Sequence, residues 1–109
     1  MFWHQRLAQW LVSDRLADLS ERVAGRSRLA VWQRVSARLA TLGASESRGY
    51  VRARAIAVVQ AETDRLIEQD GPRVAALRER IIAAATGTLV ETIVGQVQEQ
   101  RRAGRRVAA

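Results

Sequence analysis

The tripeptide Asp70-Gly71-Pro72 separates two long stretches in which apolar residues recur at helical spacing. Glycine readily reverses the chain between helices, and proline suits the first helical position, where its missing N–H leaves no bond unmade. The stretches on either side, about 46–69 and 73–100, therefore predict a long antiparallel αα-hairpin. At the helical rise per residue the second stretch would be ~42 Å long, which exceeds the diameter of a compact sphere of the same mass.

Both arms of the hairpin carry an apolar stripe along which helices pack. The first stripe comprises Val51, Ala55, Val58, Val59 and Leu66, and the second comprises Val74, Leu77, Ile81, Ala85, Leu89, Ile93 and Val97. The chain before residue 45 predicts two shorter helices that cover part of this hairpin. Gly25 is expected to end the first of them, and Ser27 to cap the second. Within the first, a break or bend near Ser13 is favoured over one helix that touches different partners along its length.

The helix expected over about 28–42 has an apolar stripe of its own, made of Leu29, Trp32, Val35, Leu39 and Leu42. The fold class predicted is thus all-α, a small helical bundle built on the long hairpin with two shorter N-terminal helices. Residues 1–100 form a single helical domain in this reading, and residues 101–109 a basic C-terminal tail.

Small residues recur every four positions on the first arm of the hairpin, at Gly49, Ala53, Ala57 and Ala61. Such a row removes the ridge that keeps helices apart, so we expect Ala57 to face another helix at short distance. Membrane-helix dimerisation, the other use of such rows, is disfavoured because five charged residues share this stretch. These are Arg48, Arg52, Arg54, Glu62 and Asp64.

The last helix spreads apolar residues over more than one face. Val90 and Val94 lie roughly a hundred degrees round the helix from the stripe that ends in Val97, so they require a second neighbour. The N-terminal segment adds Trp3, Leu7, Trp10 and Leu11 on one helical face. We therefore expect a homo-oligomer, most simply a two-fold dimer. The predicted interface residues are Val90, Val94, Val97, Trp3 and Trp10.

All 18 basic residues are arginine, and the formal net charge is +7. A GC-rich genome accounts for such a bias, yet the charge also attracts polyanions. No acid interrupts the stretch from Arg26 to Arg38. The predicted anion-binding residues are Arg34, Arg38, Arg48, Arg52, Arg101, Arg102, Arg105 and Arg106.

Catalytic chemistry is poorly represented. The chain has no cysteine, and its one histidine, His4, has no recognisable orienting partner, as a general base requires. Glu62 and Glu91 lie on or near apolar stripes but lack the Glu-x-x-His motifs of bundle metal sites, so we expect each to pair with an arginine. No enzyme activity, cofactor or metal is therefore predicted.

We expect a cytoplasmic protein, because the longest strictly apolar runs fall far short of the ~20 residues that span a bilayer. Membrane-surface binding through the N-terminal aromatic face is disfavoured, since Arg6 is the only cation on its polar side. The predicted function is non-enzymatic: protein–protein interaction or self-assembly, as an adaptor or structural protein. An anion-binding protein, with nucleic acid as its ligand, is the alternative, and an accessory subunit of an enzyme ranks third.

Overall fold

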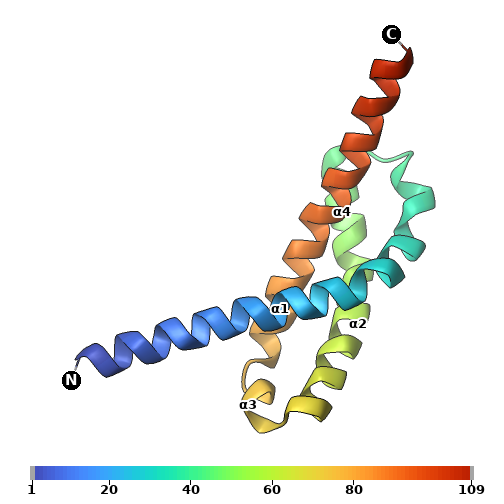
Figure 1. Ribbon diagram of the computed structural model, residues 1–109. Coiled ribbons are helices and arrows are strands. Elements are labelled where there is room, and N and C mark those ends of the chain that lie inside the picture. Colours follow the sequence, from blue (N-terminus) through green and yellow to red (C-terminus); the bar gives the residue numbers. More distant parts are fainter. Residues whose placement is uncertain (1, 109) are drawn as a thin grey trace.

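The computed structural model describes residues 2–108, with side chains described from residue 13 to residue 107. It is all-α, and the described residues contain no strand. The elements are α1 (Phe2–Leu39), α2 (Ala44–Asp70), α3 (Pro72–Ala75) and α4 (Arg78–Ala108). Helices α2 and α4 run antiparallel, and α1 crosses both of them (Figure 1). The predicted all-α fold, with long helices packed against one another, is therefore confirmed.

The turn between the arms forms as its residues dictate. Gly71 has φ of 85°, a left-handed conformation that side chains disfavour, and its N–H donates to the Ile67 carbonyl at 2.8 Å. Pro72 opens α3 at the expected first position. The second arm is nevertheless not one helix from residue 73, because the chain makes a turn at Ala76 and Leu77 before α4 starts. Helix α4 then continues through the predicted tail as far as Ala108.

The prediction of two N-terminal helices is wrong, because α1 is a single helix of 38 residues. Neither Ser13 nor Gly25 interrupts it. A mid-helix glycine costs about 0.5–1 kcal/mol relative to alanine. That cost is outweighed by burial of a row of side chains that recur every four residues along α1, on both sides of Gly25. The row comprises Leu19, Val23, Ser27, Val31, Val35 and Leu39.

The core lies where the three long helices meet. The stripes predicted for the hairpin are buried, with Leu77 and Val97 only partly covered. Val31 joins this core, whereas Leu29, expected on the buried stripe, is 66% exposed. The difference follows from the continuous α1, since the row from Leu19 to Leu39 sets a different face towards the hairpin.

The row of small residues on α2 faces solvent, so the expected close contact at Ala57 is wrong. Gly49, Ala53, Ala57 and Ala61 are all exposed, and a Cβ built on Gly49 meets nothing within 4 Å. The core face of α2 is the adjacent valine stripe instead. Alanine has the highest helix propensity, so it serves an exposed helix surface as readily as a tight contact.

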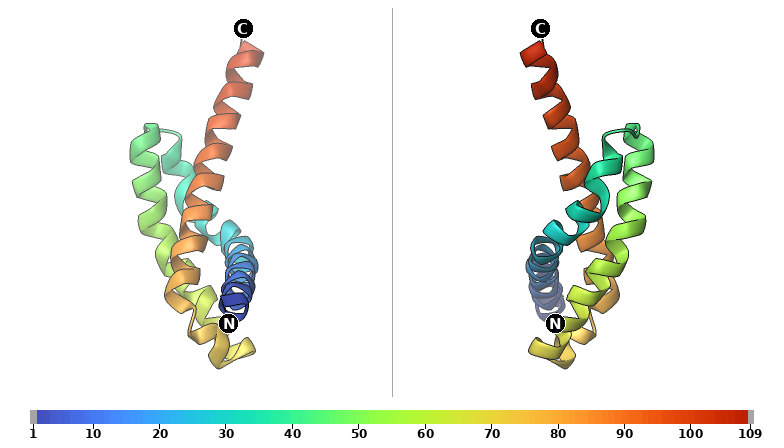
Figure 2. Two further views of the ribbon diagram at one scale, coloured as in Figure 1. Left: turned by 90° about the vertical axis from the view of Figure 1, so that its left-hand side faces the viewer. Right: turned by 90° about the vertical axis from the view of Figure 1, so that its right-hand side faces the viewer.

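The described chain is elongated, with extents of 62 × 29 × 20 Å. The N-terminal part of α1 and the C-terminal part of α4 both run beyond the rest of the bundle, in different directions (Figures 1 and 2). By length and composition alone one described stretch, Arg78–Val107, could cross a bilayer, and 44% of its most apolar window is buried in the bundle.

Candidate functional site

A groove follows the seam between α1 and α4. It consists of three adjoining cavities of about 300, 270 and 180 Å³. The first two share Trp32, and the last two share Gly25 and Arg28, so they line up along the helices. We call this surface the α1–α4 groove. Its lining residues are Glu21, Ala24, Gly25, Arg28, Leu29, Trp32, Ser36 and Ala40 of α1, with Thr88, Leu89, Thr92, Gln96, Val97, Gln100 and Arg101 of α4.

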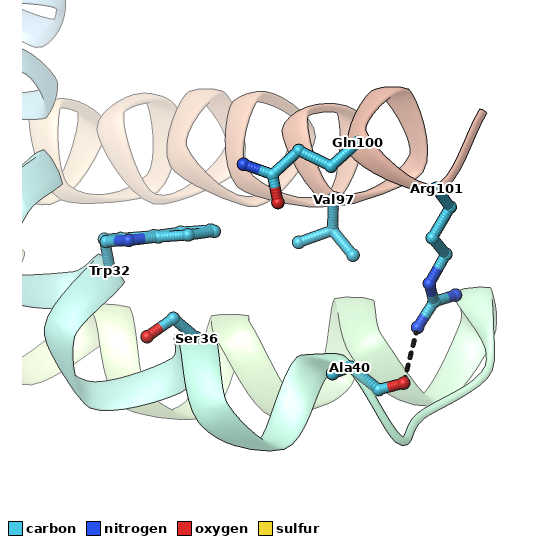
Figure 3. A pocket seen from close by; sticks show the side chains of 6 residues that line it. All are labelled: Trp32, Ser36, Ala40, Val97, Gln100 and Arg101. Atoms are coloured by element: carbon cyan, nitrogen blue, oxygen red, sulfur yellow. Dashed lines mark hydrogen bonds between the residues drawn. The ribbon is translucent and has the colours of Figure 1, made fainter. Parts of the chain in front are cut away.

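The walls of the largest cavity combine an aromatic ring with small and polar side chains. Trp32 closes one end, and Val97 and Gln100 project from α4 towards α1 (Figure 3). Ser36 and Ala40 form the opposite wall and are too short to fill the space. Leu29 lies in the next cavity and is 66% exposed, so the groove presents apolar surface that the chain itself leaves uncovered.

Two polar contacts hold the helices on either side of the groove. The Arg28 guanidinium donates to Gln96 Oε1 at 3.0 Å. Near the far end, one Arg101 nitrogen donates to the carbonyl oxygens of Leu39, Ala40 and Leu42 at 2.7, 3.2 and 3.1 Å. Because the last carbonyls of a helix lack partners within it, Arg101 caps the C-terminus of α1 from a distant point in the sequence. These contacts therefore link the two walls of the groove.

The predicted interface residues separate into three groups. Val90 and Val94 are 1% and 3% exposed in the chain's own core, so they are not available to a second molecule in this structure. Val97 is half-buried and lines the groove. Trp3 and Trp10 lie outside the side chains that the structure describes. The second neighbour that Val90 and Val94 require is supplied within the chain.

Two arginines approach the ring of Tyr50 at the seam between α1 and α2. The guanidinium carbon of Arg54 lies 3.6 Å from the Tyr50 ring centroid, and that of Arg38 lies 5.9 Å from it. Both distances are within the range of cation–π attraction. Arg34 lies one turn before Arg38 on α1 and is exposed. We call these four residues the Tyr50 cluster. Arg34 and Arg38 belong to the predicted anion-binding set, whereas Arg54 does not, although its four-residue spacing from Tyr50 was an available signal.

The remaining predicted anion-binding residues do not form one surface. Arg48 pairs with Glu91 at 3.5 Å, and Arg102 lies 4.0 Å from Glu99. Arg101 is occupied by the cap on α1. The other three, Arg52, Arg105 and Arg106, are exposed.

The carboxylates singled out from the sequence make the expected ion pairs. Glu62 accepts from Arg65, and Glu91 accepts from Arg48. A third pair joins the hairpin arms, where Arg78 Nε donates to Asp64 Oδ1 at 2.8 Å. That hydrogen bond, aided by the charge of Arg78, holds the pKa of Asp64 below its ordinary value. In the described part of the chain, no three His, Cys, Asp or Glu side chains are placed to hold a metal ion.

Comparison with known proteins gives no relative to guide the assignment. No family model, no curated protein and no solved structure matches this chain.

Proposed function

We propose that this protein is a non-enzymatic assembly protein that forms a two-fold dimer through the α1–α4 groove. The occupant of the groove is the N-terminal segment of α1 from a second copy. The observation that carries this proposal is the uncovered groove with Leu29 and Trp32 along it. Reciprocal insertion of two identical segments into two identical grooves gives a closed, isologous assembly.

The chain itself supplies an occupant of suitable shape. Spacing in the sequence places Trp3, Leu7, Trp10 and Leu11 on one face of the N-terminal segment. The backbone of α1 there runs away from the hairpin (Figure 1). From Phe2 to Ser13 a helix is ~17 Å long, and the groove wall from Glu21 to Ala40 is ~29 Å long, so the segment fits.

The area involved is sufficient for a stable pair. Each buried tryptophan contributes about 150–250 Å², so two tryptophans bury some 300–500 Å² per segment before the groove's own surface is counted. The groove loses a similar area to each segment, and the two-fold dimer contains two segment–groove contacts. The total buried area is then roughly 1,200–2,000 Å², the size of a standard specific interface.

The test is sedimentation velocity on the full chain at physiological salt over a range of concentrations. The wild type is expected to dimerise, and Leu29→Glu to be monomeric but folded, because that side chain is 66% exposed. Ile56→Glu is the matched control, since it adds the same charge at an exposed apolar residue on the outer face of α2. It is expected to leave the dimer intact.

Mixing two variants tests the exchange itself. Trp10→Glu should be monomeric because its segment is damaged, whereas its groove remains intact. Mixed with Leu29→Glu, it should recover a weaker dimer, since one intact segment then meets one intact groove. A wild type that stays monomeric at high micromolar concentration contradicts the proposal. A dimer abolished by Ile56→Glu and not by Leu29→Glu would place the interface on α2.

A further inference from the structure

We infer that the Tyr50 cluster is a phosphate-binding site for the backbone of a nucleic acid. This inference is independent of the proposed dimer, because the cluster lies at the seam of α1 and α2 and the groove at the seam of α1 and α4. Of the predicted anion-binding arginines it retains Arg34 and Arg38, and it adds Arg54, which shares the Tyr50 ring with Arg38.

Two like charges lie close together in the cluster. Arg38 and Arg54 come from different helices, yet both guanidinium groups approach the same tyrosine ring, at 5.9 and 3.6 Å. The two cations therefore lie within about a Debye length of each other, where they repel. A bound anion relieves that repulsion, so the arrangement favours binding of negative charge.

No carboxylate compensates the charge of these arginines in the described structure. Among the described side chains, none of the ion pairs involves Arg34, Arg38 or Arg54. Glu46, one turn before Tyr50, is exposed and forms no ion pair with them. Other exposed arginines, such as Arg52 and Arg105, also have no ion pair among the described side chains. The cluster differs from them because two of its guanidinium groups approach one ring.

The tyrosine ring fixes how the arginines are presented. A guanidinium group is planar and stacks on an aromatic face, which leaves its N–H groups directed around its edge. That fork matches two oxygens of a phosphate group. Arg54 at 3.6 Å is close enough for such stacking, so Tyr50 limits its side-chain freedom before any ligand binds.

A polymeric phosphate fits better than a lipid headgroup. Arg105 and Arg106 are also exposed and without ion pairs in the described structure, and they lie on another helix, in the last turn of α4. Repeating phosphates along a nucleic acid can reach separated arginines in turn. A membrane site would also need apolar side chains to insert beside the cations, whereas the neighbours at Gly49, Ala53 and Ala57 are small.

The test is fluorescence polarisation with labelled single-stranded and duplex oligonucleotides at low salt. The double variant Arg38→Gln/Arg54→Gln is expected to weaken binding about tenfold or more and to flatten the dependence on salt, since fewer counterions are released. The control Arg73→Gln/Arg80→Gln removes the same charge from exposed arginines near the hairpin turn and should change affinity by less than about twofold. Tyr50→Leu keeps every charge but removes the stacking, and an intermediate loss is expected.

Three results would overturn the inference. The first is no binding to either oligonucleotide at low salt. The second is an equal loss in the two double variants, which would mean attraction by net charge alone. The third is cluster-dependent binding to anionic phospholipid vesicles without binding to oligonucleotides, which would assign the phosphate to a lipid. Sedimentation of Arg38→Gln/Arg54→Gln separates this test from the proposed function, because the dimer should persist.

Discussion

Replacement of Arg101 by methionine tests the long-range cap on α1. Methionine keeps the unbranched apolar stem but removes every donor, so the carbonyl oxygens of Leu39, Ala40 and Leu42 lose a shared partner. The contact is also electrostatic, because the C-terminus of a helix carries partial negative charge that a cation stabilises.

The magnitude follows from the geometry. A single nitrogen carries two hydrogens, so the three acceptors share two full hydrogen bonds at most. Two of the three contacts are partly buried, and water replaces only some of what is lost. A hydrogen bond to a charged group contributes about 1.5–3 kcal/mol, and we expect Arg101→Met to lower the free energy of unfolding by about 2 kcal/mol. For a domain of this size that is a fall in Tm of roughly 8 °C or more.

Chemical denaturation monitored by circular dichroism measures this difference. Arg102→Met is the matched control, because the Arg102 side chain is 68% exposed and its one ion pair, with Glu99, is long at 4.0 Å. This variant should change the free energy of unfolding by less than about 0.5 kcal/mol. Amide hydrogen exchange adds a local readout, since the last turn of α1 should lose protection first. Equal stability of the two variants would refute the cap as a source of stability.

Three further predictions concern stability. Gly25→Ala should stabilise by about 0.5–1 kcal/mol in urea unfolding, because the position is helical and a Cβ meets nothing within 4 Å, whereas Gly71→Ala should destabilise by about 1–2 kcal/mol because of its positive φ. Thr86→Val should raise stability by about 1 kcal/mol in the same assay, since the buried hydroxyl has no hydrogen-bond partner. Arg78→Ala should raise the pKa of Asp64 towards its ordinary value in an NMR titration. In the wild type, the Asp64–Arg78 pair contributes stability above the ordinary pKa of aspartate, and this contribution is lost as the pH falls through the lowered pKa of Asp64. The variant lacks the contribution, so its free energy of unfolding should fall less than that of the wild type below about pH 4.

The hairpin could be predicted from the sequence because its signals are local. Gly71 and Pro72 are adjacent, each acts on its own backbone, and the flanking stripes are long enough to define their faces. The same kind of signal failed at Gly25, where no left-handed conformation is needed. Whether a glycine ends a helix depends on what the next turns bury, and burial of Val31 and Val35 against the hairpin keeps α1 continuous.

The groove and the Tyr50 cluster depend on how the helices are placed against one another. Arg101 and Leu39 are 62 residues apart, so no spacing rule connects them. Likewise, four-residue spacing links Arg54 to Tyr50, but nothing in the chain order brings Arg38 to the same ring. The row of small residues on α2 gave the wrong prediction at Ala57 for a related reason. Small side chains are compatible with either a neighbouring helix or solvent, so their spacing does not show which of the two they face. Only the composition of the groove walls, with Trp32 among small residues, could have been noted beforehand.

The ends of the molecule differ in charge along its 62 Å axis. Helix α4 finishes with the exposed Arg105 and Arg106, whereas the turn after α2 carries both signs of charge, because Arg73 follows Glu68 and Asp70 and Asp70 pairs with Arg22 at 3.8 Å. Two copies aligned in parallel would place the arginine ends together, whereas antiparallel copies place each one beside a turn of mixed charge. Repulsion between the ends of α4 therefore favours an antiparallel orientation at low salt. That selectivity fades as salt shortens the Debye length to about 3 Å near 1 M.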